Sequence, residues 1–369
     1  MREPKVKMGS IDFVLFIVIM TLLAIGVVMV FSVSSYYSMH SSKTNYDTFY
    51  FLKKQGLWAF LSITAMFITI KFDYHKLKKL IVPIMLITII LLIIVLFCPA
   101  VNGATRWIPL GFASIQPSEI AKYVVVLYMA KSIENKGENI KSFLYGVLPY
   151  FMVSGFYAGM VLLEKNLSIA AVIMIVTIIV VFVGGVKGKH IVALIGSVGF
   201  LGVFFILVEP YRLKRLMSFR NPWVDPKGDG YQLIQSLLAL GSGGIWGMSL
   251  GQSRQKCYYI PEPHNDFIFS IIGEELGFIG CTFIITVFLI FIWRGIRIAI
   301  NAKDTFGTLL ATGITSVIAI QALVNIAVVT GSMPVTGVPL PFISYGGSSL
   351  LINMVAMGVL LNISRQIDT

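Results

Sequence analysis

The sequence predicts an all-α polytopic membrane protein of about ten transmembrane helices with both termini in the cytoplasm. Of its 369 residues, 57% are hydrophobic and only 12% are charged. The mean hydropathy of +0.86 favours membrane helices as the main architecture over a soluble enzyme with an anchor. Asp266, Glu274 and Glu275 lie where a polar loop runs into an apolar helix. Because carboxylates are costly in such a place, they are functional candidates.

Apolar runs along the chain predict the individual spans. A straight span needs roughly twenty apolar residues, so the shorter second, fourth and tenth runs are expected to extend into polar flanks such as Lys53 to Gln55 or Pro117 to Glu119. The first run is too long for a cleaved signal and is interpreted as a retained signal anchor. The runs are Ile11 to Phe31, Gly56 to Ile70, Leu80 to Phe97, Ile120 to Ala130, Phe143 to Leu163, Leu167 to Val183, Ile191 to Val208, Phe267 to Trp293, Phe306 to Thr330 and Leu350 to Leu361.

Lysine and arginine counts give the orientation. With the N-terminus inside, the inner segments hold 16 cations, whereas the short outer segments and the outer end of the fourth span hold six. This asymmetry places both termini in the cytoplasm. The membrane is expected to be the cytoplasmic (inner) one. The loop 209–265 carries seven more cations, but long loops are weak topological evidence. We expect one transmembrane domain over residues 1–369, with 209–265 as its large extracytoplasmic loop between spans seven and eight.

Polar, Gly- and Pro-containing sequence gathers on the outer side, at 99–118, 209–265 and 331–349, so chemistry or recognition is expected there. In the last of these, Pro334, Pro339 and Pro341 forbid a continuous helix. Two interpretations stay open. The segment either lies at membrane depth against protein or a wet cavity, or it is a hydrophobic surface loop.

Several classes of site find no support in the sequence. The four histidines are scattered without ligand spacing, so a protein-held zinc or haem site is not predicted. No Walker-type loop for ATP is present. Cys98, Cys257 and Cys281 form no disulfide framework and are interpreted as free thiols. A nucleic-acid partner is not expected, because the basic loop faces outward and lacks a binding motif.

The first candidate cluster runs from Asn102 to Pro109 and from Gln116 to Lys122. Pro117 suits the first turn of a helix, and Glu119 and Lys122 then share one face, three residues apart. They are either a structural ion pair or catalytic groups. Trp107 is more simply a residue of the interfacial aromatic belt than a platform for a sugar.

The second cluster is the basic loop. Its cations are charge-assisted donors for an anion such as a diphosphate, or alternatively a surface attracted to anionic lipid headgroups. The members are Arg212, Lys214, Arg215, Arg220, Arg254 and Lys256.

The third cluster begins at Asp266. Asp266, Ser270, Gly273 and Gly277 form a small and polar stripe that permits close approach of another helix or a ligand. Asp266 is either the N-cap of this helix or a catalytic group. Glu274 and Glu275 are expected to pair with Lys or Arg from another span.

Five motifs together resemble the SEDS family (shape, elongation, division and sporulation), and the likeness covers nearly the whole chain. The run at 251–256 resembles the division and sporulation members more than the elongation member. The motifs are Asn-Pro-Trp-Val-Asp-Pro (221–226), Gly-Tyr-Gln-Leu-Ile-Gln-Ser (230–236), Gly-Gln-Ser-Arg-Gln-Lys (251–256), Pro-Glu-Pro-His-Asn-Asp-Phe-Ile-Phe (261–269) and Pro-Leu-Pro-Phe-Ile-Ser-Tyr-Gly-Gly-Ser-Ser (339–349).

The resemblance implies a ten-span peptidoglycan glycosyltransferase that polymerises lipid II on the outer membrane face. It implies a class B penicillin-binding protein (a transpeptidase) and other divisome or sporulation membrane proteins as partners. Asp266 matches the family's essential aspartate, and Glu119 and Lys122 match its acid and base pair. The predicted substrate-binding residues are Arg106 and Trp107, which match the family's outer-loop motif, with Arg212, Arg254, Lys256, His264 and Ser344.

The chain departs from this family at one place: Glu164-Lys165-Asn166 stands where many members carry a Pro-Asp pair. Whether Glu164 replaces part of that carboxylate's role is left open.

The chemistry of the candidate residues and the family resemblance together suggest one hypothesis for the reaction mechanism. Asp266 is the general base for a single inverting displacement, in which a sugar 4-hydroxyl attacks the anomeric carbon of a second lipid-linked sugar. Arg254, Lys256, Arg212 and Lys122 stabilise the leaving diphosphate, with a divalent cation (Mg or Mn) held mainly by that diphosphate. The alternatives are a lipid II flippase and a non-catalytic divisome scaffold.

Overall fold

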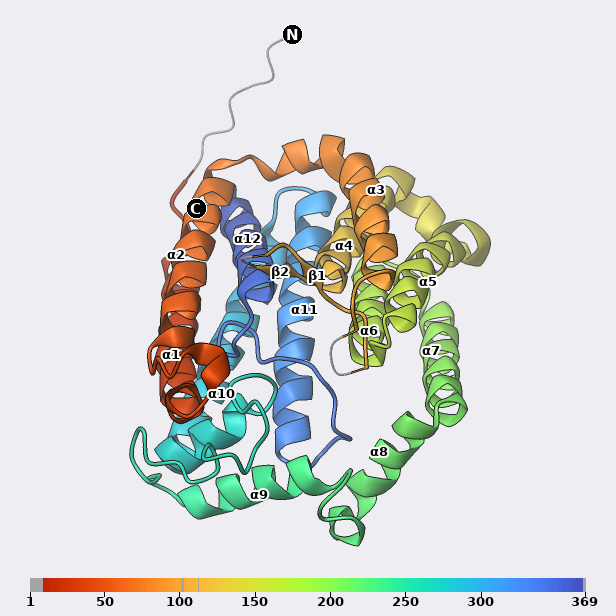
Figure 1. Ribbon diagram of the computed structural model, residues 1–369. Coiled ribbons are helices and arrows are strands. Elements are labelled where there is room, and N and C mark those ends of the chain that lie inside the picture. Colours follow the sequence, from red (N-terminus) through yellow and green to blue (C-terminus); the bar gives the residue numbers. More distant parts are fainter. Residues whose placement is uncertain (1–8, 101–102, 112, 368–369) are drawn as a thin grey trace.

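The computed structural model describes residues 9–100, 103–111 and 113–367. Helices form nearly all of the framework of that part of the chain (Figure 1). They are α1 (Phe13–Met39), α2 (Tyr50–Lys71), α3 (Leu77–Leu96), α4 (Pro117–Lys136), α5 (Leu148–Leu163), α6 (Leu167–Val183), α7 (Gly188–Val208), α8 (Pro210–Arg220), α9 (Tyr231–Gly243), α10 (Ile268–Asn301), α11 (Thr305–Val329) and α12 (Gly347–Ser364).

Seven helical stretches in the described residues are long and apolar enough to cross a membrane: those of α1, α3, α5, α7, α10, α11 and α12. The helix α6 is apolar but shorter. The fourth span bears Glu119 and Lys122 near its start, which lowers its hydropathy. All ten predicted runs overlap one helix each, and α2 and α4 begin at Tyr50 and Pro117, so both helices include the expected polar flanks. The chain is therefore a multi-pass helical membrane protein.

Two features of the structure differ from the predicted architecture, which was all-helical with one long loop at 209–265. Strands β1 (Ile108–Pro109) and β2 (Ser114–Ile115) form an antiparallel hairpin, in which Ile108 pairs with Ile115. The predicted loop 209–265 contains the helices α8 and α9. Pro210 occupies the first turn of α8, where its missing N–H costs nothing. The prediction treated polar composition as loop and so missed both.

The bundle is built around α11, which packs against α4, α6 and α10 (Figure 1). The helices α8 and α9 lie across one end, opposite the end at which α12 finishes. At the edge stands α7, whose only buried residue is Leu194. An apolar helix with so little protein contact is suited to face lipid on most sides.

The helix α10 breaks at Gly277, which has a φ of 66°. A Cβ on Gly277 would lie 2.3 Å from the backbone nitrogen of Gly247, and one on Gly273 would lie 2.4 Å from Leu240 Cδ2. Glycine at both positions therefore lets the end of α9 cross α10 at close range. This confirms the close helix approach predicted from the small-residue stripe.

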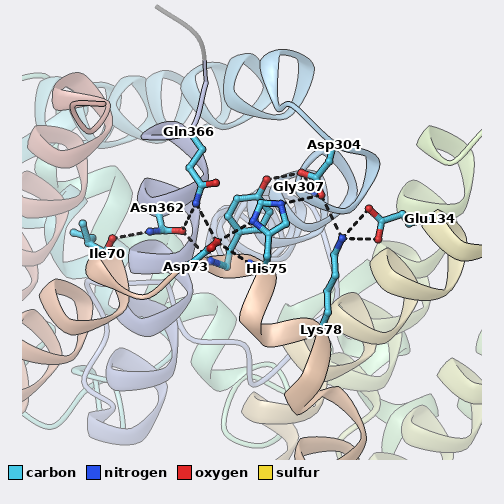
Figure 2. A network of polar contacts seen from close by, with 10 residues as sticks. Ile70, Asp73, His75, Lys78, Glu134, Asp304, Gly307, Asn362 and Gln366 are labelled. Atoms are coloured by element: carbon cyan, nitrogen blue, oxygen red, sulfur yellow. Dashed lines mark hydrogen bonds and ion pairs between the residues drawn. The ribbon is translucent and has the colours of Figure 1, made fainter. Parts of the chain in front are cut away.

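A polar network ties four parts of the chain together at the end where α12 finishes (Figure 2). His75 lies between two carboxylates, with Nδ1 2.8 Å from Asp73 and Nε2 3.4 Å from Asp304. Lys78 reaches Glu134 at 2.7 Å and Asp304 at 3.5 Å. Because these residues come from the α2–α3 connection, the start of α3, α4 and the N-cap of α11, the network fixes those elements to one another. Asn362 and Gln366 add α12 and the residues after it.

Candidate functional site

Asp266 lies in the loop directly before α10, and its side chain is half-buried. The N-cap residue of α10 is Phe267, and no side chain caps that end of the helix, so the N-cap interpretation of Asp266 is wrong. Asn325 of α11 holds the backbone here, because its Nδ2 donates to the carbonyl oxygens of Asp266 and Val338, each at 2.8 Å. The carboxylate is thus positioned by its main chain and is not used as a cap.

A cavity of about 570 Å³ opens beside this carboxylate. Its wall combines the hairpin region, the start of α2, the loop before α10 and the segment that leads into α12. Aromatic, cationic and hydroxyl groups therefore surround one acid, which is the composition expected of a site for a polar, charged ligand. The lining residues used below are Lys54, Trp58, Arg106, Trp107, Gln116, Asp266, Gly337 and Ser349.

The segment 331–346 forms one wall of the cavity and is not helical. Leu340, Phe342 and Ile343 are buried in the protein. Gly26 of α1 allows this docking, since a Cβ there would lie 2.3 Å from the Phe342 carbonyl oxygen. Of the two interpretations left open by the sequence, the segment buried against protein and lining a cavity is confirmed.

Two arginines set the electrostatics at Asp266. Burial raises the pKa of this carboxyl to about 6, with a smaller contribution from the negative charge of Glu262, and the positive charges of Arg106 and Arg215 oppose that rise. A Cβ on Gly337 would lie 3.4 Å from Asp266 Oδ2 and 3.6 Å from Arg106 Nη1, so the two side chains flank this glycine. An acid with a pKa just below neutrality is ionised at pH 7 yet accepts a proton readily.

Glu119 and Lys122 form a buried ion pair on α4, with Lys122 Nζ 2.9 Å from Glu119 Oε2 and side chains at most 1% exposed. Ser349, which lines the cavity, donates to the same Glu119 oxygen at 2.8 Å. The other oxygen, Oε1, has no hydrogen-bond partner. The pair therefore lies behind the cavity wall, one hydrogen bond away from it.

The Gly-Gln-Ser-Arg-Gln-Lys run wraps around the buried Glu274 and Glu275. Glu274 accepts hydrogen bonds from the Ser253 hydroxyl and from the backbone nitrogens of Arg254, at 3.0 Å, and Gln255, at 3.3 Å. Lys256 Nζ lies 3.0 Å from Glu275 and also donates to the Ser32 and Gly251 carbonyls. Glu275 therefore pairs with a cation, as expected, but the cation comes from the loop and not from another span. The expected pairing of Glu274 is wrong for the described residues, because its contacts there are a hydroxyl and backbone nitrogens.

Lys256→Met is expected to lower the free energy of unfolding by about 2–3 kcal/mol, because it leaves Glu275 buried without its cation. The loss stays below that of a fully stranded charge, since the Ser32 hydroxyl still donates to Glu275 at 2.6 Å. Arg254→Ala in the same run is the matched control. Its side chain is exposed, and we expect a change within about 0.5 kcal/mol. Equal melting temperatures for the two variants in detergent would contradict this assignment.

Three other predicted substrate-binding residues have protein partners: His264, Ser344 and Arg212. His264 is buried among the rings of Tyr37, Phe51 and Tyr345, and this burial lowers its pKa to about 4. The Ser344 hydroxyl donates to the Asn265 carbonyl at 2.7 Å and accepts from the Leu340 nitrogen at 2.8 Å.

Arg212 of α8 donates to the Phe205 carbonyl of α7 at 3.0 Å, across the α7–α8 bend. Of the predicted site residues, the cavity wall thus contains Asp266, Arg106 and Trp107. Asn102 of the first cluster lies outside the described residues.

The sequence did not single out several residues at the site. Lys54 had been counted only as an outer cation, and Arg215 only as one member of the basic loop. Arg215 donates to the Val335 carbonyl at 3.2 Å and so lies beside the cavity segment. Its position three residues after Arg212, on the same helical face, was the available signal. Gln116 and Ser349 lay inside quoted segments but were not named as site residues. Trp58 and Asn325 carried no signal, because distant elements bring them to the site.

The described residues contain no group of three or more His, Cys, Asp and Glu side chains that could hold a metal ion. Asp266 is the one carboxylate in the described cavity wall. The three cysteines are free, as expected. The wall does not form a protein-held metal site.

The fold and the cavity define a class: a multi-pass membrane protein with a charged cavity between its helices and its non-helical segments. The chain belongs to the FtsW, RodA and SpoVE family of cell cycle proteins, whose family model matches residues 12–369. This confirms the resemblance to the SEDS family.

Relatives of known sequence and solved structures match this chain over nearly its whole length. The chain is 45% identical to Stage V sporulation protein E of Bacillus subtilis, over 97% of this chain and 98% of the relative. It is 42% identical to the probable peptidoglycan glycosyltransferase FtsW of Geobacter sp., over 98% of each chain. Similarity to these two supports a division or sporulation member.

Among solved structures, a chain from a peptidoglycan synthase complex superposes with a TM-score of 0.79 at 26% identity, covering 96% of this chain and 98% of that one. The rod shape determining protein RodA of Thermus thermophilus gives a TM-score of 0.70 at 25% identity, with 98% of each chain covered.

Proposed function

We propose that this protein is a peptidoglycan glycosyltransferase that polymerises lipid II into glycan strands on the outer face of the cytoplasmic membrane, in cell division or sporulation. The names of the relatives support the activity. The observation that carries the proposal is the half-buried Asp266 carboxylate at the cavity, with Arg106 and Arg215 close enough to shift its pKa.

Asp266 acts as the general base. The hydroxyl at sugar position 4 of one lipid-linked substrate gives its proton to Asp266 and forms a bond to the anomeric carbon of the other. The bond from that carbon to the diphosphate breaks, the configuration inverts, and the electron pair leaves with the diphosphate.

The leaving diphosphate needs positive charge close to the cavity. Arg106 and Lys54 line it, and Arg215 lies next to Asp266. We assign the diphosphate to these three cations. Arg254, Lys256 and Arg212 are less suited, because none of them lines the cavity or lies close enough to Asp266 to shift its pKa. Lys256 is in addition paired with Glu275. Trp107 and Trp58 offer aromatic surface for the sugar rings.

The Glu119–Lys122 pair positions the wall. Through Ser349 it connects α4 to the start of α12, where Gly347 packs so closely on Trp58 that a Cβ would lie 2.2 Å from the indole ring. A divalent cation remains part of the proposal only as a companion of the substrate's diphosphate, where it would neutralise negative charge.

We further propose a single domain with ten spans and both termini in the cytoplasm. Each of the ten predicted runs overlaps a helix, and seven of these helical stretches are long and apolar enough to span. Together with the 16 inner against six outer short-loop cations, this supports the topology. Partners are then a class B penicillin-binding protein and other divisome or sporulation proteins. The likeness to a chain of a peptidoglycan synthase complex supports such an assembly.

The rate of polymerisation is expected to fall below about pH 6, by about tenfold per pH unit, because protonated Asp266 no longer accepts the sugar proton. The rate of strand formation from lipid II, measured from about pH 5 to 7.5 with the protein confirmed folded at each pH, tests this. A rate that is constant across this range would exclude a base with the pKa of Asp266.

A further inference from the structure

Glu164 is a buried acid that the proposed reaction does not use. It follows the last residue of α5 in the short turn to α6, and its side chain is 0% exposed. Neither carboxyl oxygen makes a well-aligned hydrogen bond. Its polar neighbours are the Ser118 hydroxyl of α4 and the Arg106 guanidinium. A buried carboxyl with so few donors is much more stable carrying its proton than ionised.

Arg106 connects this turn to the cavity. Its Nη2 donates to the carbonyl of Lys165, the residue after Glu164, at 2.5 Å. Its Nη1 lies 3.6 Å from the position of a Cβ on Gly337, the glycine that also adjoins Asp266. One guanidinium therefore stands between two carboxyl groups, Glu164 at the α5–α6 turn and Asp266 at the cavity.

Charged residues near Glu164 lie on three parts of the chain: the segment before β1, the α5–α6 turn and α4. Arg106 belongs to the segment before β1, and Lys165 in the turn itself is exposed. On α4, Glu119 and Lys122 pair with each other next to Ser118. Burial raises the pKa of Glu164 to about 8, and Ser118 and Arg106 oppose the rise. At pH 7 most molecules thus hold this carboxyl neutral.

We propose that Glu164 is a positioning residue for Arg106: with its proton it packs against the guanidinium and leaves the positive charge directed at the cavity, whereas its ionised form draws that charge away. This inference rests on the proposed function. An ionised Glu164 would compete with Asp266 and with the substrate's diphosphate for the same guanidinium. The protein would then lose activity at alkaline pH through a group that touches no substrate.

The test is the pH profile of strand formation from lipid II for the wild type and Glu164→Gln. Glutamine keeps the size and neutral charge of the protonated acid. We expect equal kcat/KM at about pH 7, a wild-type decline of about tenfold per pH unit above about pH 8, and no such decline for the variant. Glu138→Gln, at an acid whose side chain is 85% exposed, is the matched control and should decline like the wild type. A wild type without an alkaline decline, or a decline retained by Glu164→Gln, would overturn the proposal.

A second measurement needs no substrate. The folded protein keeps the Glu164 proton up to about pH 8, whereas an unfolded glutamate loses it near 4.5. Because the native state binds the extra proton between these values, wild-type stability should fall as pH rises through this window and level off above it. The melting temperature of Glu164→Gln should fall less over the same range. Parallel melting curves would show that Glu164 does not hold a proton, whether or not the protein polymerises lipid II.

Discussion

Asp266→Asn is expected to reduce strand formation by about 10²–10⁴-fold, because asparagine occupies nearly the same volume but accepts no proton from the sugar hydroxyl. The loss should appear in kcat at saturating lipid II. Glu262→Gln is the matched control: this exposed carboxylate lies four residues earlier in the same loop, and its partner is Asn265. We expect its rate to stay within about twofold of wild type.

The same Asp266→Asn substitution should not destabilise the fold. The folded-state pKa of Asp266 is raised to about 6, so the native state binds the extra proton between the ordinary value of 3.8 and 6. Wild-type stability therefore decreases with rising pH through that window, and the cost is fully present at pH 7. Removing the ionisable group removes that cost, so the variant should melt at the wild-type temperature or above it. A marked drop in melting temperature would mean that Asp266 is structural.

Lys122→Met is expected to have the largest effect on stability, about 3–5 kcal/mol, because it leaves Glu119 buried without its cation. One Glu119 oxygen already has no hydrogen-bond partner. The double variant Glu119→Gln with Lys122→Met should recover most of this loss, since neither buried charge remains.

The double variant also separates a structural pair from a catalytic one. Substantial activity in a stable double variant would assign the pair to holding Ser349 and the cavity wall, as proposed. A stable but inactive double variant would contradict that assignment and favour a direct role in catalysis. Thermal unfolding in detergent and strand formation on the same preparation give both readouts.

The helices could be predicted because a long apolar run in a membrane satisfies its backbone hydrogen bonds by forming a helix. Residues such as Pro117 also mark where a helix begins. The broken segment before α12 was likewise evident from its three prolines, but its burial was not. That burial depends on Gly26, which lies over 300 residues away in sequence and admits the Phe342 backbone. No local pattern contains such a contact.

The site was predictable where a residue lies in a motif and faces the cavity, as Asp266, Arg106 and Trp107 do. It was not predictable where motif residues serve the framework. Lys256 has the chemistry of a phosphate ligand, yet three acceptors, including Glu275, surround its ammonium group. The sequence shows which chemical group a side chain carries but not which group it contacts. For this reason the prediction named Lys256 and Arg212 as diphosphate ligands, whereas the structure favours Arg215 and Lys54.

The decisive measurement is glycan-strand formation from purified lipid II by the reconstituted protein, comparing wild type with Asp266→Asn. It should be run with and without the cognate penicillin-binding partner and with a divalent cation or a chelator. We expect strands from the wild type under at least one of these conditions and none from a folded Asp266→Asn variant. Strands from both proteins would contradict the role of Asp266 as base. No strands from a folded, partner-bound wild type under any condition would contradict the transferase function and favour a flippase or a scaffold.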